Sequence, residues 1–171
     1  MFHLYYGEGK GKTTAAMGMA LRALGHCHKL LIAQFMKDGR TGELQALRGT
    51  SAIIFDSTCL DKFTFQMDQD ELAEASRLIA ADIERLIALI DKEKPQTIIL
   101  DELAIATHLG LVTECAAHRL ITAALQHGET IVTGRNAPVS FIERADYVSE
   151  VVSRRHPFDD KSLPAREGVE W

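Results

Sequence analysis

A short stretch of glycines and lysines constrains the possible folds of this chain more than any other feature. Residues 7–14 read Gly-Glu-Gly-Lys-Gly-Lys-Thr-Thr. The apolar segment 1–6 before them is typical of a short strand, and the small residues of 15–24 after them are typical of a helix. Strand, glycine-rich turn and helix in this order form the context of a phosphate-binding loop. An ordinary glycine-rich turn is the alternative interpretation.

The residue types of this loop suit an anion. Gly7, Gly9 and Gly11 allow a tight turn that points backbone N–H groups inward, and the helix N-terminus adds a partial positive charge. Lys12 can reach phosphate oxygens, and the hydroxyl of Thr13 can ligate Mg²⁺. The loop is one residue shorter than the usual G-x-x-x-x-G-K-[ST], because a tyrosine stands where the first glycine is required. A shorter loop cannot wrap a triphosphate in the usual way.

Size and charge restrict the function further. A chain of 171 residues with 46% hydrophobic and 25% charged residues fits one globular domain, 1–171, with a tail at 153–171. The formal net charge of −5 gives no sign of a general nucleic-acid or acidic-membrane surface. Anion binding is therefore expected to be local, and we expect neither nucleic acid nor a membrane as a partner.

Cysteine usage and hydropathy indicate the compartment. The three cysteines are scattered without metal-type spacing, which favours free, mostly buried thiols in a reducing environment. No apolar run approaches the ~20 residues needed to cross a bilayer. The chain opens directly on its first predicted strand, so no targeting peptide is expected. These features predict a cytoplasmic protein.

Strand and helix patterns alternate along the chain. Asp68 and Glu71 form a capping-box-like start for a long amphipathic helix that ends before Pro95. Further helices are predicted at 113–127 and 140–145, and further strands at 29–35, 52–55, 97–100, 130–133 and 147–152. This alternation predicts an α/β fold whose mostly parallel sheet carries helices on both faces.

Ligands of such sheets bind at the carboxyl ends of the strands. This rule brings the loop, Lys37, the pair Asp101-Glu102, Arg135 and the tail to one edge. One of the two carboxylates would hold Mg²⁺ beside Thr13, and a helix-capping acid is the alternative. Arg135 can bridge phosphates or stack on a base, unless it is a plain surface arginine.

Two other segments carry candidate residues. Phe63 and Phe65 stand two apart in the irregular segment 59–67, where they either have a functional role or simply plug the core. The tail bases Arg154, Arg155 and His156 are either functional or a solvated basic patch. Among the seven histidines, only His156 is singled out.

Motifs along nearly the whole chain resemble those of one family. The family's G-N-G-K-G-K-T-T, Q-F-[IM]-K, G-F-T-W, L-D-E-[LI] and T-G-R correspond here to residues 7–14, 34–37, 62–65, 100–103 and 133–135. Its closing patterns K-H-[AP]-F-D and G-[IV]-[ED]-[YW] correspond to 155–159 and 168–171. The chain thus resembles the P-loop type of ATP:corrinoid adenosyltransferase, the cob(I)yrinic acid a,c-diamide adenosyltransferase family.

The resemblance implies a RecA-like P-loop fold, a homodimer and a specific reaction. The 5′-deoxyadenosyl group of ATP passes to the Co(I) of a corrinoid and triphosphate is released, in adenosylcobalamin synthesis or salvage. Mg²⁺ or Mn²⁺ is the implied cofactor, and a reductase supplies Co(I). In the family, ATP lies in reversed polarity, so the shortened loop would hold a leaving group that departs whole. Because Co(I) itself attacks C5′, no general base is needed, and none is evident in the sequence.

The same resemblance assigns roles to single residues. It implies that Lys10, Lys12 and a metal ion on Thr13, Asp101 or Glu102 stabilise the triphosphate, and that Phe63, Phe65 and His156 contact the corrinoid. The aromatic pair would cover the lower face of the corrin. Among the differences from the family pattern are Glu8 in place of asparagine and Phe65 in place of tryptophan. The implied ATP site comprises Gly7, Glu8, Gly9, Lys10, Gly11, Lys12, Thr13, Thr14 and Arg135. A small P-loop ATPase or kinase, and a non-catalytic corrinoid carrier, are the alternative functions.

Overall fold

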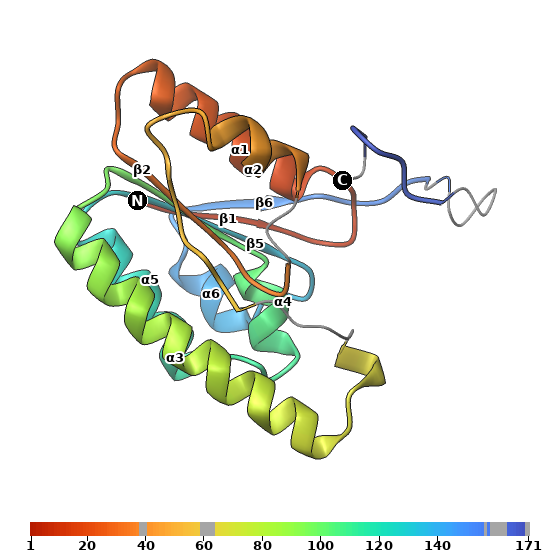
Figure 1. Ribbon diagram of the computed structural model, residues 1–171. Coiled ribbons are helices and arrows are strands. Elements are labelled where there is room, and N and C mark those ends of the chain that lie inside the picture. Colours follow the sequence, from red (N-terminus) through yellow and green to blue (C-terminus); the bar gives the residue numbers. More distant parts are fainter. Residues whose placement is uncertain (38–40, 59–63, 156, 158–163, 170–171) are drawn as a thin grey trace.

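A parallel sheet forms the centre of the molecule (Figure 1). The computed structural model describes residues 1–37, 41–58, 64–155, 157 and 164–169. Their six strands follow the order β3-β2-β4-β5-β1-β6, and every pairing is parallel. The predicted α/β class is therefore confirmed. The strands are β1 (Phe2–Tyr6), β2 (Leu30–Gln34), β3 (Ile53–Ile54), β4 (Thr97–Asp101), β5 (Glu129–Gly134) and β6 (Tyr147–Glu150).

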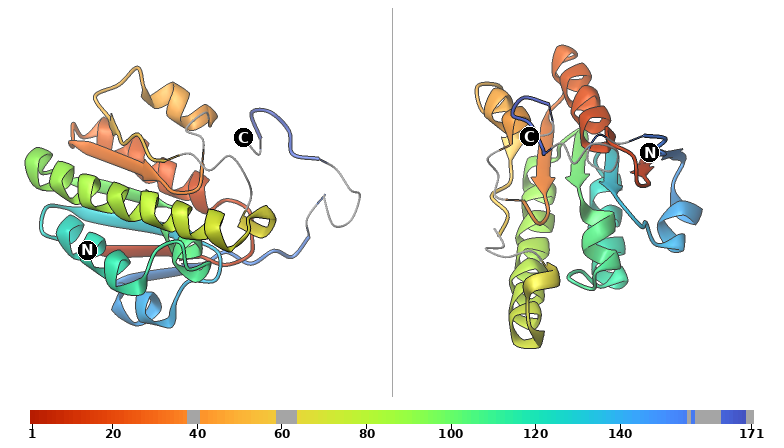
Figure 2. Two further views of the ribbon diagram at one scale, coloured as in Figure 1. Left: turned by 60° about the horizontal axis from the view of Figure 1, so that its bottom comes forward. Right: turned by 90° about the vertical axis from the view of Figure 1, so that its right-hand side faces the viewer.

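Helices cover both faces of the sheet, as Figure 2 shows from two further directions. The helices α1 (Lys12–Gly25) and α2 (Gly42–Leu47) lie on one face. The other face carries α3 (Gln69–Glu93), α4 (Leu103–His108), α5 (Glu114–Leu125) and α6 (Val139–Arg144). A 3₁₀ turn at Thr64–Gln66 precedes α3. The sequence predicted α1, α3, α5 and α6 but not α2 or α4, because six-residue helices are too short for a clear helical period.

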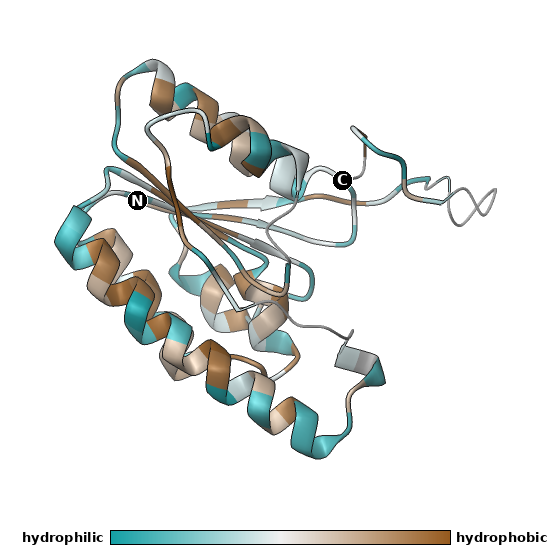
Figure 3. Cartoon of the chain, viewed as in Figure 1, coloured by the Kyte–Doolittle hydropathy of each residue, from teal (hydrophilic) through white to brown (hydrophobic). Residues whose placement is uncertain are grey.

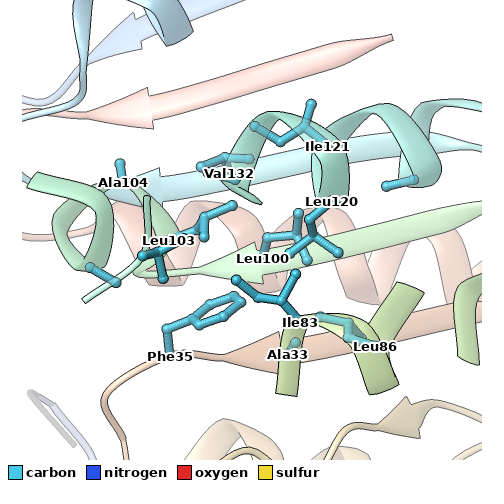
Figure 4. Close-up of a cluster of buried hydrophobic side chains, with 14 of the residues drawn as sticks. Ala33, Phe35, Ile83, Leu86, Leu100, Leu103, Ala104, Leu120, Ile121 and Val132 are labelled. Atoms are coloured by element: carbon cyan, nitrogen blue, oxygen red, sulfur yellow. The ribbon is translucent and has the colours of Figure 1, made fainter. Parts of the chain in front are cut away.

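The long helix α3 shows how local sequence determines the packing. Its predicted capping box is confirmed, since Asp68 accepts from the backbone N–H of Glu71 at 2.9 Å and the Glu71 side chain accepts from that of Asp68 at 3.1 Å. Most of its apolar residues face the sheet and most of its polar ones face away, although Asp82 is buried (Figure 3). In Figure 4, Ile83 of α3 lies beside Leu100 of β4, and both are essentially inaccessible to solvent. Each side chain buried in this way contributes about 1.5–3 kcal/mol of transfer free energy.

Three further expectations concern the surface. The strand β6, predicted at 147–152, is a sheet edge whose four residues are all exposed. In the described ranges, no helix is both long and apolar enough to cross a membrane. The expectation of mostly buried thiols is wrong for the two described cysteines, because Cys27 and Cys115 are exposed. Cys27 lies in the turn after α1 and Cys115 in the first turn of α5. The third, Cys59, lies outside the described residues.

Candidate active site

The loop between β1 and α1 needs glycine at defined positions. Gly7 and Gly11 adopt φ values of 106° and 114°, in the left-handed range that side chains disfavour. A Cβ atom on Gly7 or Gly9 would also lie 2.6 or 2.8 Å from the carbonyl oxygen of Val151, which follows β6. The Gly9 N–H donates to that same oxygen at 2.7 Å. Neighbouring strand β6 therefore holds the loop in shape through Val151.

Lys12 begins α1 and is the most buried cation of the loop. Its side chain extends beside the glycines and donates to the carbonyl oxygen of Gly9 at 2.7 Å, with only 7% of the residue exposed. Burial lowers the pKa of Lys12 below its usual value, although the nearby carboxylate of Glu102 partly opposes this shift. A poorly solvated ammonium group at a helix N-terminus favours a bound anion.

Beneath the loop lies a buried carboxylate, Asp101, at the end of β4. One of its oxygens accepts from the hydroxyls of Thr13 at 2.9 Å and Thr133 at 2.6 Å. The other accepts from the amide of Gln34 at 3.0 Å and from the ammonium of Lys37 at 2.7 Å. Four donors match the roughly four lone-pair sites of a carboxylate. Asp101 thus joins the ends of β2, β4 and β5 to the start of α1, and we call these five residues the floor of the site.

Glu102, the next residue, faces a different environment. Its φ of 63° is left-handed, and its backbone N–H donates to the Thr133 hydroxyl at 3.0 Å. Burial, with the adjacent Asp101 as a further cause, raises the pKa of Glu102. The pKa of Lys37 shifts in the opposite sense to what burial alone would cause. Burial would lower it, but the charge and hydrogen bond of Asp101 raise it above the usual value. Lys37 is therefore a charged lysine at neutral pH.

A cavity of about 300 Å³ opens above the floor. At its rim, the Arg135 guanidinium lies 3.5 Å from the Glu8 carboxylate, and both side chains are 58% exposed. A neighbouring cavity of about 370 Å³ shares Lys37 with the first. The first cavity is lined by Glu8, Gly9, Lys10, Gly11, Lys12, Thr13, Thr14, Lys37, Glu102, Arg135 and Val169.

The structure brings most of the predicted site residues together. Loop residues 8–14, Glu102 and Arg135 all line one cavity, whereas Asp101 lies beneath it in the floor. Phe63, His156 and the side chain of Phe65 lie outside the described residues. Sequence reasoning assigned no role to Gln34 and Thr133 in the floor. Their position in the sequence could have indicated this role, since each is a polar residue at or near the carboxyl end of a buried strand.

The site suits a divalent cation of the Mg²⁺ type. Thr13, Asp101 and Glu102 offer hydroxyl and carboxylate oxygens, the ligands that Mg²⁺ prefers. Thr13 and Glu102 both line the cavity, so an ion held there would also reach a bound polyphosphate. The residues present therefore fit such an ion.

A parallel α/β sheet whose glycine- and lysine-rich loop opens α1 over an acidic strand end defines a nucleotide-binding protein of the P-loop class. Within that class the comparisons are specific. The sequence model of the family described as "ATP:corrinoid adenosyltransferase BtuR/CobO/CobP" matches residues 1–171. The chain belongs to this family, as its motifs predicted.

Individual relatives agree with that assignment. The corrinoid adenosyltransferase of Pseudomonas aeruginosa is 33% identical over 175 residues, covering 98% of this chain and 82% of the relative. That of a Sinorhizobium species is 31% identical over 168 residues, covering 96% and 77%. The corrinoid adenosyltransferase CobA of Salmonella typhimurium is 28% identical over 171 residues, covering 98% and 84%. By family the chain is a transferase whose substrates are ATP and a corrinoid.

Proposed function

We propose that the cavity above the floor holds the triphosphate of ATP while the 5′-deoxyadenosyl group passes to the Co(I) of a corrinoid. Cobalt attacks C5′ with its electron pair, and the bond between C5′ and the α-phosphate oxygen breaks. The electrons of that bond leave with the triphosphate. The observation that carries this proposal is the cationic loop, with Lys10 and Lys12, on a fixed, buried floor.

The protein's contribution is positioning and electrostatic stabilisation. Lys12 is held beside Gly9 by its hydrogen bond, so its ammonium is already placed where negative charge grows on the leaving triphosphate. Arg135 faces the same cavity from the end of β5 and would hold the nucleotide. No residue is needed as a general base, because the reaction transfers no proton.

The metal ion belongs with Glu102 rather than Asp101 in this proposal. Asp101 already accepts four hydrogen bonds and is fully buried, whereas Glu102 lines the cavity. We therefore assign Thr13 and Glu102 as ligands of Mg²⁺ or Mn²⁺. Asp101 is assigned as the residue that positions Thr13 and Lys37. The bound ion would neutralise charge on the departing triphosphate.

The corrinoid contacts rest on the family resemblance. Phe63, Phe65 and His156 are proposed to contact the corrinoid, with the aromatic pair covering its lower face and displacing the axial ligand of cobalt. Replacing Phe65 with alanine is then expected to lower activity most for corrinoids that carry a lower ligand. Initial rates with cobalamin and cobinamide measure this, and equal losses on the two substrates would exclude the aromatic-wall role.

The assembly and cellular setting are proposed on the same basis. We propose a single cytoplasmic domain whose tail, 153–171, packs near the active site. Val169 of that tail lines the cavity, which supports this placement. We also propose a homodimer that receives Co(I) corrinoid from a reductase. Light scattering on the purified protein measures its mass in solution and tests the dimer.

One assay tests the function. The protein is incubated with MgATP and chemically reduced cobalamin, the loss of Co(I) absorbance is followed, and the phosphate product is identified. Stoichiometric triphosphate together with an alkylated corrinoid is the expected result. ADP and inorganic phosphate would instead indicate an ATPase. Corrinoid binding without turnover would indicate a carrier, and either outcome would overturn the proposal.

A further inference from the structure

Glu8 is an acid inside a loop whose other side chains and backbone favour anions. It stands second in the loop, directly before Gly9, and it lines the same cavity as Lys12. Its carboxylate lies 3.5 Å from Arg135, across the loop from the end of β5. A carboxylate in that position pairs with the guanidinium of Arg135, the same cation that a bound polyphosphate would contact.

The electrostatic environment agrees with this geometry. Burial lowers the pKa of Lys12, and Arg135 lowers it further, whereas Glu102 and Glu8 raise it. Glu8 thus acts on Lys12 with the same sign as a phosphate oxygen would. Its side chain is 58% exposed, so it can leave Arg135 without disturbing packed structure.

We propose that Glu8 competes with the polyphosphate for Arg135 and so limits how tightly the site holds its product. This inference rests on the function proposed above. Glu8 is in this view a positioning residue whose removal tightens binding, in contrast to the lysines of the same loop.

Glu8 is expected to weaken the binding of the product triphosphate more than the binding of the substrate ATP. When the bond from C5′ to oxygen breaks, the electrons stay on the triphosphate, which then carries one more negative charge than it did within ATP. Because Coulomb repulsion scales with charge, Glu8 repels the released triphosphate more strongly than ATP. Product release limits the turnover of many enzymes, and an acid at this position would speed it.

The first test is equilibrium binding without corrinoid. Glu8→Gln keeps the size of the side chain and removes its charge. At low ionic strength we expect it to raise the affinity for magnesium tripolyphosphate about tenfold and for MgATP about threefold, and the gain should shrink near 0.5 M salt. Titration calorimetry with each ligand measures both. A change below twofold for tripolyphosphate, or an equal gain for both ligands, would overturn the inference.

The matched control is Glu84→Gln. Glu84 forms a similarly exposed pair with Arg119 at 2.8 Å, but it lies on α3 and does not line the cavity. Its removal changes the net charge by the same amount, so a comparable gain in this variant would assign the effect to overall charge and refute a local role. Both substitutions are at exposed positions, and thermal denaturation checks that each variant is folded.

A second test addresses Arg135 itself. If Glu8 acts by competing for this guanidinium, its removal should raise tripolyphosphate affinity by less than threefold in an Arg135→Gln background. An undiminished tenfold gain would show that Arg135 is not involved. Failure of the inference is distinguishable from failure of the proposed function. Wild-type protein that binds neither MgATP nor tripolyphosphate contradicts the function itself, whereas normal binding that Glu8→Gln leaves unchanged contradicts only this inference.

Discussion

The floor and the rim of the cavity use similar residue types under opposite physical conditions. In the floor, Asp101 is inaccessible to solvent and accepts four hydrogen bonds of 2.6–3.0 Å. At the rim, Glu8 faces Arg135 at 3.5 Å, and both side chains are more than half exposed. A buried network rigidifies what it joins, whereas an exposed ion pair contributes about 0–1 kcal/mol.

This difference separates two kinds of mutational effect. Removing a partner from the floor leaves buried groups unsatisfied, which costs stability as well as activity. Removing a rim charge changes what the site attracts but leaves the fold intact. A measurement that combines activity with thermal stability therefore tests each residue's assignment.

The largest effect is expected for Asp101→Asn. The amide cannot accept from all four donors and leaves the ammonium of Lys37 without its counter-charge. We expect stability to fall by about 3 kcal/mol, corresponding to about 6–12 °C in Tm, and activity to fall at least ~100-fold. Calorimetry and the transfer assay measure the two losses. An active variant with wild-type Tm would contradict the floor as a structural network.

Lys12→Ala should abolish most activity at little cost in stability. The Lys12 ammonium donates one hydrogen bond among the described residues, to the carbonyl oxygen of Gly9, and burial already disfavours its charge. Activity is expected to fall about 10²–10³-fold, as on loss of a stabilising donor. The Tm should stay within about 3 °C of the wild type. A large fall in Tm would show that Lys12 has a structural role instead of the ligand-binding role assigned to it.

The sequence predicted the residues that line the cavity better than the hydrogen-bond network of the floor, for a physical reason. The loop is contiguous, so Gly7 to Thr14 carry their signal in one stretch. Arg135 and Glu102 follow strands, and the rule for parallel sheets places strand ends at one edge. The floor instead depends on strand order. Gln34 and Thr133 meet Asp101 only because β4 lies between β2 and β5, and no local pattern gives that order.

Short elements mark another limit of sequence reasoning. The helix α4 begins directly after Glu102, whose left-handed backbone ends β4 and turns the chain. Six residues provide less than two turns of periodicity, so α4 was indistinguishable from a loop. The missed helix matters, because Glu102 is the residue that directly precedes it and also lines the cavity.

An intermediate effect is expected for Glu102→Gln. Because Glu102 lines the cavity as a proposed metal ligand, this substitution should weaken the apparent affinity for Mg²⁺ about 10- to 100-fold. Burial and the charge of Asp101 disfavour the carboxylate of Glu102, so its neutralisation should leave Tm unchanged or slightly higher. Titration of activity with MgCl₂ measures the first effect. If the Mg²⁺ dependence were unchanged, Glu102 would not be a metal ligand, and Asp101 would be the carboxylate to assign in its place.

The smallest effect is expected far from both regions, at His118 on α5. Its Nδ1 faces the Arg144 guanidinium at 3.0 Å, and its Nε2 faces Ser140, which donates to Glu114 at 2.7 Å. Burial is the main cause that lowers the pKa of His118 in the folded protein, and the positive charge of Arg144 is the second. Between that value and the ~6.5 of an unfolded chain, the unfolded state binds more protons.

His118 therefore contributes stability that is complete above pH ~6.5 and is lost as the pH falls toward its folded pKa. Denaturant unfolding of the wild type from pH 7.5 to 5 should show this loss, and His118→Gln should reduce the slope in that window. Because other groups titrate in both proteins, the difference between the two curves isolates His118. The pH profile of kcat should be the same in both, since the residues that the His118 ring contacts in the described part of the chain, Ser140, Phe141 and Arg144, do not line the cavity. If the activity profile shifted while the stability curves stayed parallel, the charge of His118 would affect the active site. The division between structural and ligand-binding charges would then no longer hold.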